Sequence, residues 1–530
     1  MTRSGRDAPQ ETNSGSWRIA FAEAAGYNNA QPSNKEIGQM AAFYYVGCDL
    51  GAESGRVMLG CLQDGKFSVE EIHRFANGPV EVCGTLRWDV LRIFEELKAG
   101  LRMVAARGVP VVGLSTDSWG VDYVLLHGDE PMLTAPFNYR DARTDGALER
   151  AFAEVPADLI FEQTGIQFMS INTLYQLLAD RDRRPAVLKM ADRFLLIGDY
   201  FNYLFSGVAK AEASLASTTQ LYNTRKRKWS PLLIRKFRLP KKIFPDIVSS
   251  GTVLGPMLPA VAEQTGLKGV QVVAGCSHDT AAAVAAVPAE GADWAYLSSG
   301  TWSLVGVEVK KPIINEQSRS LNYTNEEGYG PSTRFLKNLI GLWILQECRR
   351  DWARQGQDFS YADLVAQAQQ APPLRSLIYP NAPRFLKPGD MLRKIAEYCE
   401  QTQQPVPSTP GEVTRCVCES LALAYAQCLR EIETITGRRV RVFHIVGGGS
   451  KNELLNQLTA NATGLPVRAG PVEATAIGNM LVQALALGQL ESHEHLRAVV
   501  RESFPLTHYE PQDTSTWRAA QERFERLPTT

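Results

Sequence analysis

The feature that most constrains the fold is a pattern of strand, short turn and strand that occurs twice. It is found in "FYYVGCDLGAESGRVMLGCL" from residue 43 and again in "DWAYLSSGTWSLVGVEV" from residue 293. Apolar runs of this length, separated by glycine and other small residues, are typical of paired buried strands. Amphipathic helices are expected later in each half, over 88–108 and 412–437. The sequence therefore predicts an α/β protein whose second half repeats the organisation of the first.

Length and composition describe a globular chain with no charge bias. The 530 residues suffice for roughly two to four ordinary domains. The formal net charge of -1 argues against a general attraction to nucleic acid or anionic membranes, and no apolar run reaches the roughly 18 residues of a membrane span. The nine cysteines are scattered and odd in number, which favours reduced thiols in a cytoplasmic protein. Cys399, Cys416 and Cys418 are close enough in sequence to allow a disulfide.

The two ends differ from the rest of the chain. Residues 1–42 are polar, rich in small residues and without the apolar core of a signal peptide. We expect a disordered extension there. Residues 506–530 are expected to form a polar tail with little core.

The two turns suggest a site for phosphate groups. Backbone N–H groups in turns such as "LGAESGR" and "LSSGTW" can form concave nests that bind anions. Asp49 stands beside the first turn, where a carboxylate would repel phosphate unless a cation lay between them, and Mg²⁺ suits that position. The alternative is that Asp49 only caps the turn by local hydrogen bonds.

A third loop with the same potential is "VGGGSKN" at 446–452, between an expected strand and an expected helix. Its glycines allow close approach of the backbone to a phosphate or a flat ring. The spacing fits neither a P-loop nor the dinucleotide-binding pattern. An ordinary strand-to-helix turn is the alternative.

Two strand ends carry candidate catalytic or ligand-binding groups. In "STDSWGVD" the residues Asp117, Trp119, Gly120 and Asp122 could line a polyol pocket, or form a polar loop around a packed tryptophan. In "GCSHDTAAAV" the pair His278-Asp279 ends a buried strand before an apolar helix. Asp279 could accept a proton from a hydroxyl, or could cap that helix, or do both.

Taken together, these stretches resemble the FGGY family of carbohydrate kinases, within the actin and hexokinase superfamily of ATPases. The resemblance rests on "DLGAESGR", "TDSWGVD", "YRDART", "CSHDTAAAV", "LSSGTWSLVG" and "HIVGGGSKNELLNQLTA", in that order, and covers about residues 43–500. It implies two RNase-H-like domains facing a central cleft. The first, 43–288, would bind the sugar, and the second, 289–505, would bind the nucleotide.

The resemblance also implies roles for individual residues. Asp279 would be the general base and Asp49 would face Mg²⁺. The sugar would contact Gly120, His278 and Asn338. The residues expected at ATP are Ala52, Glu53, Ser54, Gly55, Arg56, Thr301, Gln346 and Gly448. Glu53 departs from many relatives, which carry Ser or Thr there, so its side chain is expected to turn away from phosphate or meet the metal.

Longer stretches narrow the expected substrate. "SHDTAAAVAAVP", "LKNLIGLWILQE" and "AGPVEATAIGN" are most similar to the branch of the family that phosphorylates L-rhamnulose at O1. The lysine–tryptophan signature of the glycerol and xylulose branches is absent after "YRDART". Alternatives are a kinase for another ketose or polyol, such as L-fuculose or L-xylulose, and a catalytically inactive sugar-sensing protein on the same fold. A monomer or homodimer acting on ATP and a free sugar is expected.

Overall fold

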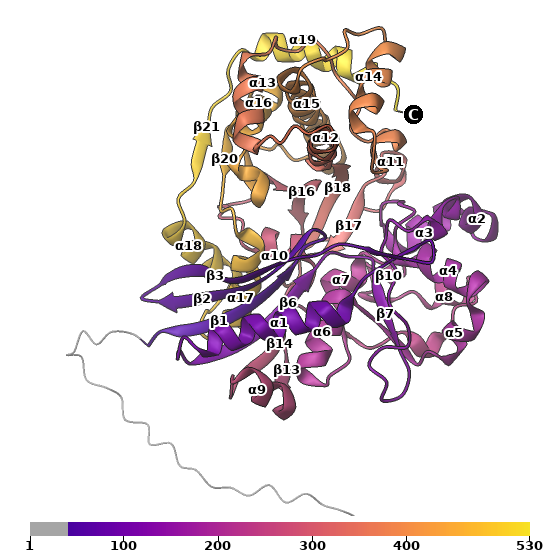
Figure 1. Ribbon diagram of the computed structural model, residues 1–530, viewed down its shortest axis with the longest axis vertical. Helices are drawn as coiled ribbons and strands as arrows, with labels where there is room; N and C mark the ends of the chain where they lie inside the picture. The colour runs from indigo at the N-terminus through magenta and orange to yellow at the C-terminus, as the bar shows by residue number, and fades with distance from the viewer. Residues whose placement is uncertain (1–40, 530) are drawn as a thin grey trace, which may run out of the picture. The chain divides into compact units, whose positions relative to one another are not determined.

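Two large β-sheets organise the chain in the computed structural model, which describes residues 41–529 (Figure 1). The predicted disordered extension, 1–42, lies outside the described residues except for its last two. In chain order the first sheet contains β1 (Phe43–Leu50), β2 (Ser54–Gln63), β3 (Lys66–Ala76), β6 (Val111–Ser118), β13 (Thr252–Pro256) and β14 (Gln271–Ala274). The second contains β15 (Trp294–Ser299), β16 (Trp302–Val309), β17 (Thr324–Glu327), β18 (Thr333–Ile340), β19 (Val442–Val446), β20 (Val467–Ala469) and β21 (Thr507–Tyr509).

The predicted strand–turn–strand pattern opens each sheet. β1 pairs with β2 in antiparallel register and with β6 in parallel register. β15 likewise pairs with β16 antiparallel and with β19 parallel. The prediction that the second half repeats the organisation of the first is therefore confirmed at the centre of both sheets.

Helices cover these sheets and the segments between them. Those of the first half are α1 (Val90–Ala105), α2 (Ala147–Glu154), α3 (Ala157–Thr164), α4 (Thr173–Arg183), α5 (Pro185–Met190), α6 (Ile197–Ser206), α7 (Ala213–Ser217), α8 (Pro231–Lys236), α9 (Pro259–Thr265) and α10 (Asp279–Ala285). Those of the second half are α11 (Glu316–Ser320), α12 (Trp343–Arg354), α13 (Tyr361–Gln370), α14 (Met391–Gln401), α15 (Pro410–Thr436), α16 (Glu453–Thr463), α17 (Ala474–Ala486), α18 (His493–Ser503) and α19 (Thr514–Glu525).

Short strand pairs complete the fold. They are β4 (Val80–Val82) with β5 (Thr85–Arg87), β7 (Tyr123–Leu126) with β8 (Arg193–Leu196), β9 (Ala211–Glu212) with β12 (Ile247–Val248), and β10 (Tyr222–Asn223) with β11 (Lys228–Trp229).

The two predicted amphipathic helices form for local reasons. α1 begins where the Asp89 side chain accepts a hydrogen bond from the Arg92 N–H, and it buries Ile93, Leu97 and Leu101 at helical spacing. α15 begins with a capping box between Thr409 and Glu412, and ends at a left-handed glycine. Both helices were predicted to within a few residues.

Helix α17 belongs to the second half in sequence but packs on the first sheet. The Gln483 side chain donates to the carbonyl of Val46 on β1, at 2.9 Å, and Asn479 donates to the Asp117 carboxylate on β6, at 2.6 Å. α17 also packs along α10, where a Cβ on Gly478 would lie 1.9 Å from the Ala282 carbonyl oxygen. Only glycine allows that approach. This packing of α17 and α10 brings the ends of both sheets to one site. The residue bounds of the two domains stay a prediction.

The expected polar tail, 506–530, is wrong in part. Residues 507–509 form β21 at the edge of the second sheet, and α19 buries Trp517 and Phe524 against the core. The apolar residues of α19 are few, but their spacing lets them cover α15 and α16. The composition of this segment did not indicate that packing.

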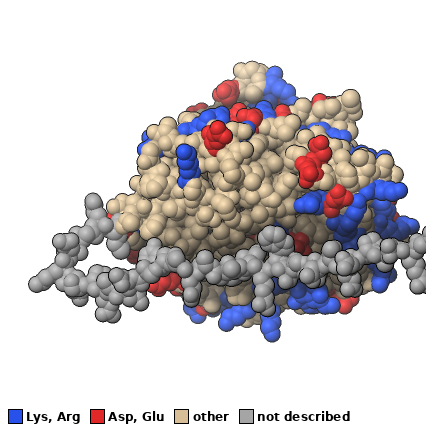
Figure 2. All heavy atoms as spheres, turned by 90° about the horizontal axis from the view of Figure 1, so that it is seen from below, with Lys and Arg blue, Asp and Glu red and all other residues tan. Residues whose placement is uncertain are grey.

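The cysteines and the surface charges agree with what the composition predicted. The nine cysteines are free, and the Cys399 thiol interacts with that of Cys416. Figure 2 shows charges of both signs on the visible face. Among the described residues, no helix combines the length and apolar character needed to cross a membrane.

Candidate active site

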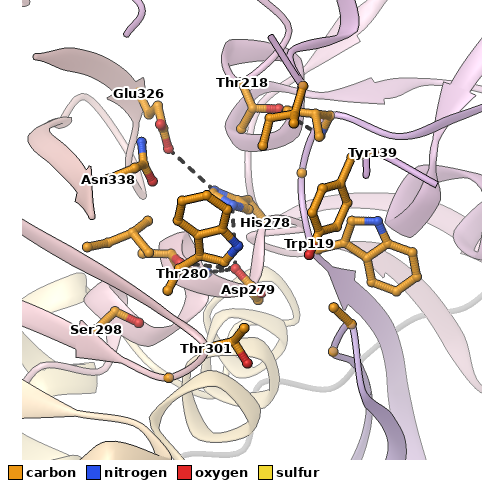
Figure 3. Close-up of a pocket in the computed structure, with 18 of the residues that line it drawn as sticks. Trp119, Tyr139, Thr218, His278, Asp279, Thr280, Ser298, Thr301, Glu326 and Asn338 are labelled. Carbon is orange, nitrogen blue, oxygen red and sulfur yellow. Dashed lines mark hydrogen bonds and ion pairs between the residues drawn. The ribbon is translucent and has the colours of Figure 1, made fainter. Parts of the chain in front are cut away.

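A cavity of about 300 Å³ lies where the ends of the two sheets meet (Figure 3). Residues from both halves line it, and the labelled side chains surround His278 and Asp279. Of the residues predicted from sequence, the cavity brings together Ala52, Trp119, Gly120, His278, Asp279, Thr301, Asn338 and Gly448.

Three backbone turns line this cavity. They are the β1–β2 turn at Gly51 and Ala52, the β15–β16 turn at 298–301, and the loop at 447–448. A Cβ on Gly449 would lie 1.9 Å from the Ser299 hydroxyl oxygen, so the third loop packs tightly on the second turn. Gly448, next to it, faces open space. The N–H groups of Gly51, Gly300 and Gly447 already donate within the protein. Those of the neighbouring residues in such turns can bind an anionic ligand.

Asp279 occupies the first position of α10 and does not cap it. His278 is the N-cap residue, and the Asp279 carboxylate accepts hydrogen bonds from the N–H and hydroxyl of its neighbour Thr280. The Asp279 side chain retains 32% exposure, toward the cavity. Burial of the carboxyl, together with the charge of Asp49, raises the pKa of Asp279 to about 7. A carboxylate with that pKa is suited to accept a proton near neutral pH.

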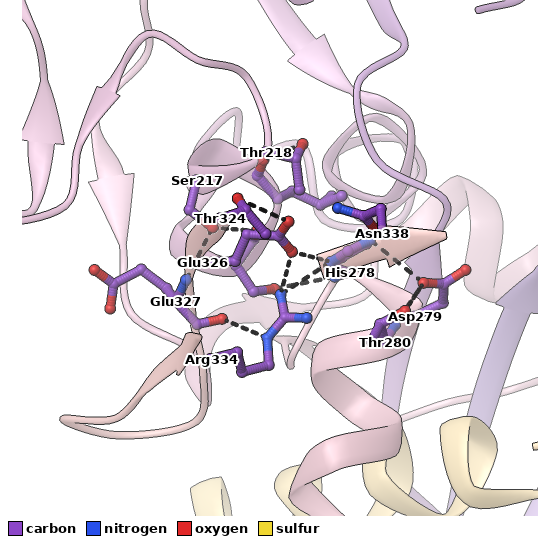
Figure 4. Close-up of polar contacts among 12 residues, drawn as sticks. Ser217, Thr218, His278, Asp279, Thr280, Thr324, Glu326, Glu327, Arg334 and Asn338 are labelled. Atoms are coloured by element: carbon purple, nitrogen blue, oxygen red, sulfur yellow. Dashed lines mark hydrogen bonds and ion pairs between the residues drawn. The ribbon is translucent and has the colours of Figure 1, made fainter. Parts of the chain in front are cut away.

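His278 lies beside Asp279 and is held by the second half of the chain (Figure 4). Its Nδ1 is 3.0 Å from Nη2 of Arg334 on β18 and 3.5 Å from Oε2 of Glu326 on β17. Its Nε2 is 3.4 Å from Oδ1 of Asp279. Burial and the Arg334 charge lower the pKa of His278 well below its ordinary value, so the imidazole is neutral.

A cluster of carboxylates lies under the first turn. Asp49 and Asp117 are neighbours in the β1–β6 register, and Oδ1 of Asp117 is buried without a hydrogen-bond partner. Burial and the charges of Asp49 and Asp279 raise the pKa of Asp117 well above its ordinary value. The described residues contain no group of three or more His, Cys, Asp or Glu arranged to hold a metal ion. A Mg²⁺ that takes one or two carboxylates and fills its shell with substrate phosphates and water fits this donor set.

Comparison with known proteins now identifies the family. Residues 44–286 match the N-terminal domain of the FGGY family of carbohydrate kinases, and residues 295–487 match its C-terminal domain. The protein belongs to the FGGY family of carbohydrate kinases. It is 42% identical to the rhamnulokinase of Bacteroides thetaiotaomicron over 90% of this chain and 97% of that one. It is 40% identical to the rhamnulokinase of Bacillus subtilis, over 88% of this chain and 96% of that one.

Solved structures show the same fold at much lower identity. A ligand-bound xylulose kinase from Lactobacillus acidophilus superposes with a TM-score of 0.76 at 17% identity, covering 92% of this chain and 97% of that one. A glycerol kinase from Plasmodium falciparum with ADP gives 0.72 at 14%, covering 91% and 98%. The prediction of an FGGY-type α/β fold is confirmed.

Two acids predicted to line the sugar pocket of this FGGY kinase do not reach the cavity. Asp117 is fully buried and binds Asn479. Asp122 is also fully buried, and its carboxylate accepts hydrogen bonds from the indoles of Trp88 and Trp119 and from the Tyr139 N–H. Burial raises the pKa of Asp122 to about 6. Asp122 therefore holds the loop in place, and the prediction that both acids line a polyol pocket is wrong.

The turn between β1 and β2, predicted to bind phosphate, differs from the prediction in its side chains. Among residues 52–56 only Ala52 lines the cavity. Glu53 turns away and pairs with Arg350 on α12. The Arg56 guanidinium binds the carboxylates of Asp49 and Glu473. Ser54 and Gly55 lie in β2, and a Cβ on Gly55 would collide with the Phe75 ring.

Gln346 is also set back from the cavity. Its amide donates to the Thr301 hydroxyl, at 3.3 Å, so it supports the second turn from behind. The predicted ATP residues in the second half thus divide into Thr301 and Gly448, which line the cavity, and Gln346, which does not.

Several cavity residues were not predicted from the sequence, among them Gln167 and Val121. Gln167 accepts hydrogen bonds from the N–H and side-chain amide of Asn338, at 2.9 and 3.0 Å, and so orients a predicted sugar contact. Val121 has a φ of 70°, which is unfavourable for a β-branched residue. Its carbonyl accepts a hydrogen bond from the Thr173 hydroxyl at 2.6 Å, which helps hold it. No local pattern marked either residue.

Proposed function

We propose that this FGGY kinase transfers the terminal phosphoryl group of ATP to O1 of L-rhamnulose. The observation that carries the proposal is its similarity, at 40–42% identity and over nearly their whole length, to proteins named rhamnulokinase. The cavity supports it because a candidate base and three backbone turns open into the same space.

The proposed sugar site is the part of the cavity next to Asp279. Trp119 and Gly120 lie on its first-half side, and Asn338 faces it from β18. The segment between α3 and α4 adds the apolar side chains of Ile166, Met169 and Ile171. Such a surface suits the methyl group of a 6-deoxy sugar, which L-xylulose lacks and L-fuculose shares.

The proposed nucleotide site is formed by the three turns. Their N–H groups would bind the phosphates, with Thr301 and the open face of Gly448 at the cavity wall. Mg²⁺ held at Asp49, with Asp117 beside it, would neutralise phosphate charge when bound. Both assignments are proposals.

The proposed chemistry follows from the state of Asp279. Phosphoryl transfer proceeds through a loose transition state, so positioning and charge stabilisation supply much of the rate. Asp279 would orient the sugar hydroxyl and take its proton as the new P–O bond forms. With its pKa near 7, both the ionised and the protonated forms of Asp279 are populated around neutral pH before substrates bind.

A ketose panel tests the proposal. The full chain is incubated with ATP and Mg²⁺ and with L-rhamnulose, L-fuculose, L-xylulose or no sugar, and ADP release is coupled to an optical readout. We expect the largest sugar-dependent kcat/KM with L-rhamnulose, and a phosphorus NMR signal from a 1-phosphate. A preference for L-fuculose or L-xylulose would overturn the substrate assignment. No turnover with any sugar, together with retained sugar binding, would favour the inactive sensing protein.

A further inference from the structure

Arg334 is a buried arginine that the proposed chemistry does not use. It lies on β18 with no exposed surface, and its Nε donates to the Glu327 carbonyl at 3.0 Å. Its Nη2 reaches Oε2 of Glu326 and Nδ1 of His278, both at 3.0 Å. Arg334 and Glu326 come from the second half, whereas His278 ends a strand of the first (Figure 4). The imidazole of the first half is thus held by two side chains of the second half.

The direction of these hydrogen bonds fixes the position of the imidazole proton. A guanidinium has only donors, so the Nδ1 atom that meets Arg334 must be an acceptor. In a neutral imidazole the proton then resides on Nε2. That nitrogen is 3.4 Å from Oδ1 of Asp279 and lies at the cavity.

We propose that Arg334 and Glu326 are positioning residues that hold His278 as the Nε2–H tautomer, so that it donates toward Asp279 and the sugar. The catalytic consequence rests on the proposed kinase function, whereas the tautomer itself does not. Glu326 acts by binding the same Nη2 group, which fixes the guanidinium against the ring.

The charges around the ring show why Arg334 is needed. Arg334 from β18, Glu326 from β17 and Asp279 from α10 face the imidazole, and Glu212 binds the backbone N–H of Ser277 beneath it. Without Arg334, the nearest group to Nδ1 would be the Glu326 carboxylate, at 3.5 Å. A carboxylate accepts, so Nδ1 would then carry a proton. Because Asp279 also accepts at Nε2, the ring would become either the Nδ1–H tautomer or an imidazolium.

Nitrogen-15 NMR of the full chain labelled at histidine tests the tautomer directly. His278, one of seven histidines, is assigned by the signal lost in His278→Gln. We expect the wild type to show an unprotonated Nδ1 and a protonated Nε2, and to stay neutral at a pH below the ordinary pKa of histidine. A protonated Nδ1, or an imidazolium at pH 6, would overturn the proposal without any variant. The measurement needs no sugar, so it stands apart from the substrate assignment.

Variants add the functional readout. In Arg334→Met we expect Nδ1 to become protonated and kcat to fall about 10–100-fold, of the order of one misplaced catalytic contact, with little change in KM for ATP. Arg334→Leu is a second donor-free variant if Arg334→Met does not fold, whereas Arg334→Lys keeps a donor and should keep the tautomer. An unprotonated Nδ1 in a folded donor-free variant would refute the assignment.

Lys337→Met is the matched control. Lys337 lies on the same strand but on its opposite face, and pairs with Glu431 at 3.0 Å with 13% of each side chain exposed. Its loss also breaks a largely buried ion pair. It should reduce stability while leaving the His278 signals and kcat unchanged. If Lys337→Met shifted the His278 signals as Arg334→Met does, the effect would be general distortion of β18.

Discussion

One strand of each sheet, β14 in the first and β20 in the second, leads into a helix, and the two junctions are built alike. β14 runs through His278 into α10, and β20 runs through Glu473 into α17, with the two helices packed together. Each junction is bound by an arginine from the other half, Arg334 at the first and Arg56 at the second.

The junctions differ in what the arginine meets. Arg56 binds two carboxylates directly, and the charges of Asp49 and Glu473 outweigh its burial and raise its pKa. Arg334 binds one carboxylate and a neutral imidazole, and the next residue, Asp279, keeps its carboxylate open to the cavity. The same architecture therefore gives an ion-paired joint at one junction and a free, weakly acidic carboxyl at the other.

Removing the free carboxyl should have the largest effect. We expect Asp279→Asn to lower kcat by about 10²–10⁴-fold, the usual contribution of a positioned base, with smaller changes in sugar and ATP affinity. Steady-state kinetics and calorimetric titration measure the two effects separately. Asp89→Asn is the control, because Asp89 also begins a helix and asparagine caps equally well. Turnover of Asp279→Asn near that of the control would remove the general base from the proposal.

Breaking the ion-paired junction should act on stability. Arg56→Met leaves Asp49 and Glu473 without their shared cation, at side-chain exposures of 9% and 30%. We expect the free energy of unfolding to fall by about 3 kcal/mol, the lower end for a broken buried pair. Chemical denaturation measures it. Arg74→Met, which breaks an exposed pair with Glu71, should cost less than about 1 kcal/mol. Equal losses would show that the second junction is not a structural joint.

The pH dependence of kcat/KM should depend on the Asp279 carboxyl at the first junction. A base must be ionised, so with a pKa of about 7 for Asp279 we expect kcat/KM to fall tenfold per pH unit below 7, and about 100-fold at pH 5. The raised pKa also means that the folded state holds this proton more tightly than the unfolded chain. The contribution of Asp279 to stability is therefore lost as the pH rises through about 7. A flat kcat/KM between pH 5 and 7 would contradict the raised pKa.

Much of the first junction and of the strands around the site was predictable because the signals are local. Apolar runs, glycine turns and a polar pair at a strand end identified β1, β2, β15 and His278-Asp279. Side-chain destinations were not predictable in the same way. Asp122 and Trp119 belong to one motif, yet Trp119 lines the cavity and Asp122 is buried behind it.

No local sequence pattern indicated which residues pair with others far away along the chain. Arg334 lies 56 residues from His278, and nothing in the sequence of its strand, β18, marks it as a partner of that histidine. Asn479 lies 362 residues from Asp117. These contacts depend on how the two sheets pack against each other. Neither the periodicity of apolar residues nor the turn residues in the sequence indicate that packing. The packing of α17 on the first sheet was missed for the same reason.

Neighbouring glycines in the second half allow a finer test of the nucleotide assignment. Gly448 faces open space in the cavity, whereas Gly449 packs on Ser299. We expect Gly448→Ala to raise KM for ATP about tenfold, equivalent to about 1.4 kcal/mol, without loss of stability. Gly449→Ala should instead destabilise the fold, because its Cβ would overlap the serine hydroxyl. Unchanged ATP kinetics in Gly448→Ala would place the nucleotide elsewhere.

The smallest effect is expected at Glu53, the acid inside the first turn. Its carboxylate pairs with Arg350 across the two halves, with 41% and 48% of the two side chains exposed. Exposed pairs contribute about 0–1 kcal/mol and are screened by salt. We therefore expect Glu53→Gln to change kcat and KM for ATP by less than about fivefold, and Arg350→Gln to do the same. A much larger loss in Glu53→Gln alone, relieved by raised Mg²⁺, would mean that the carboxylate swings from Arg350 to the metal when nucleotide binds. The β1–β2 turn would then contribute a side chain to catalysis, and the first half would supply more than the sugar site and the base.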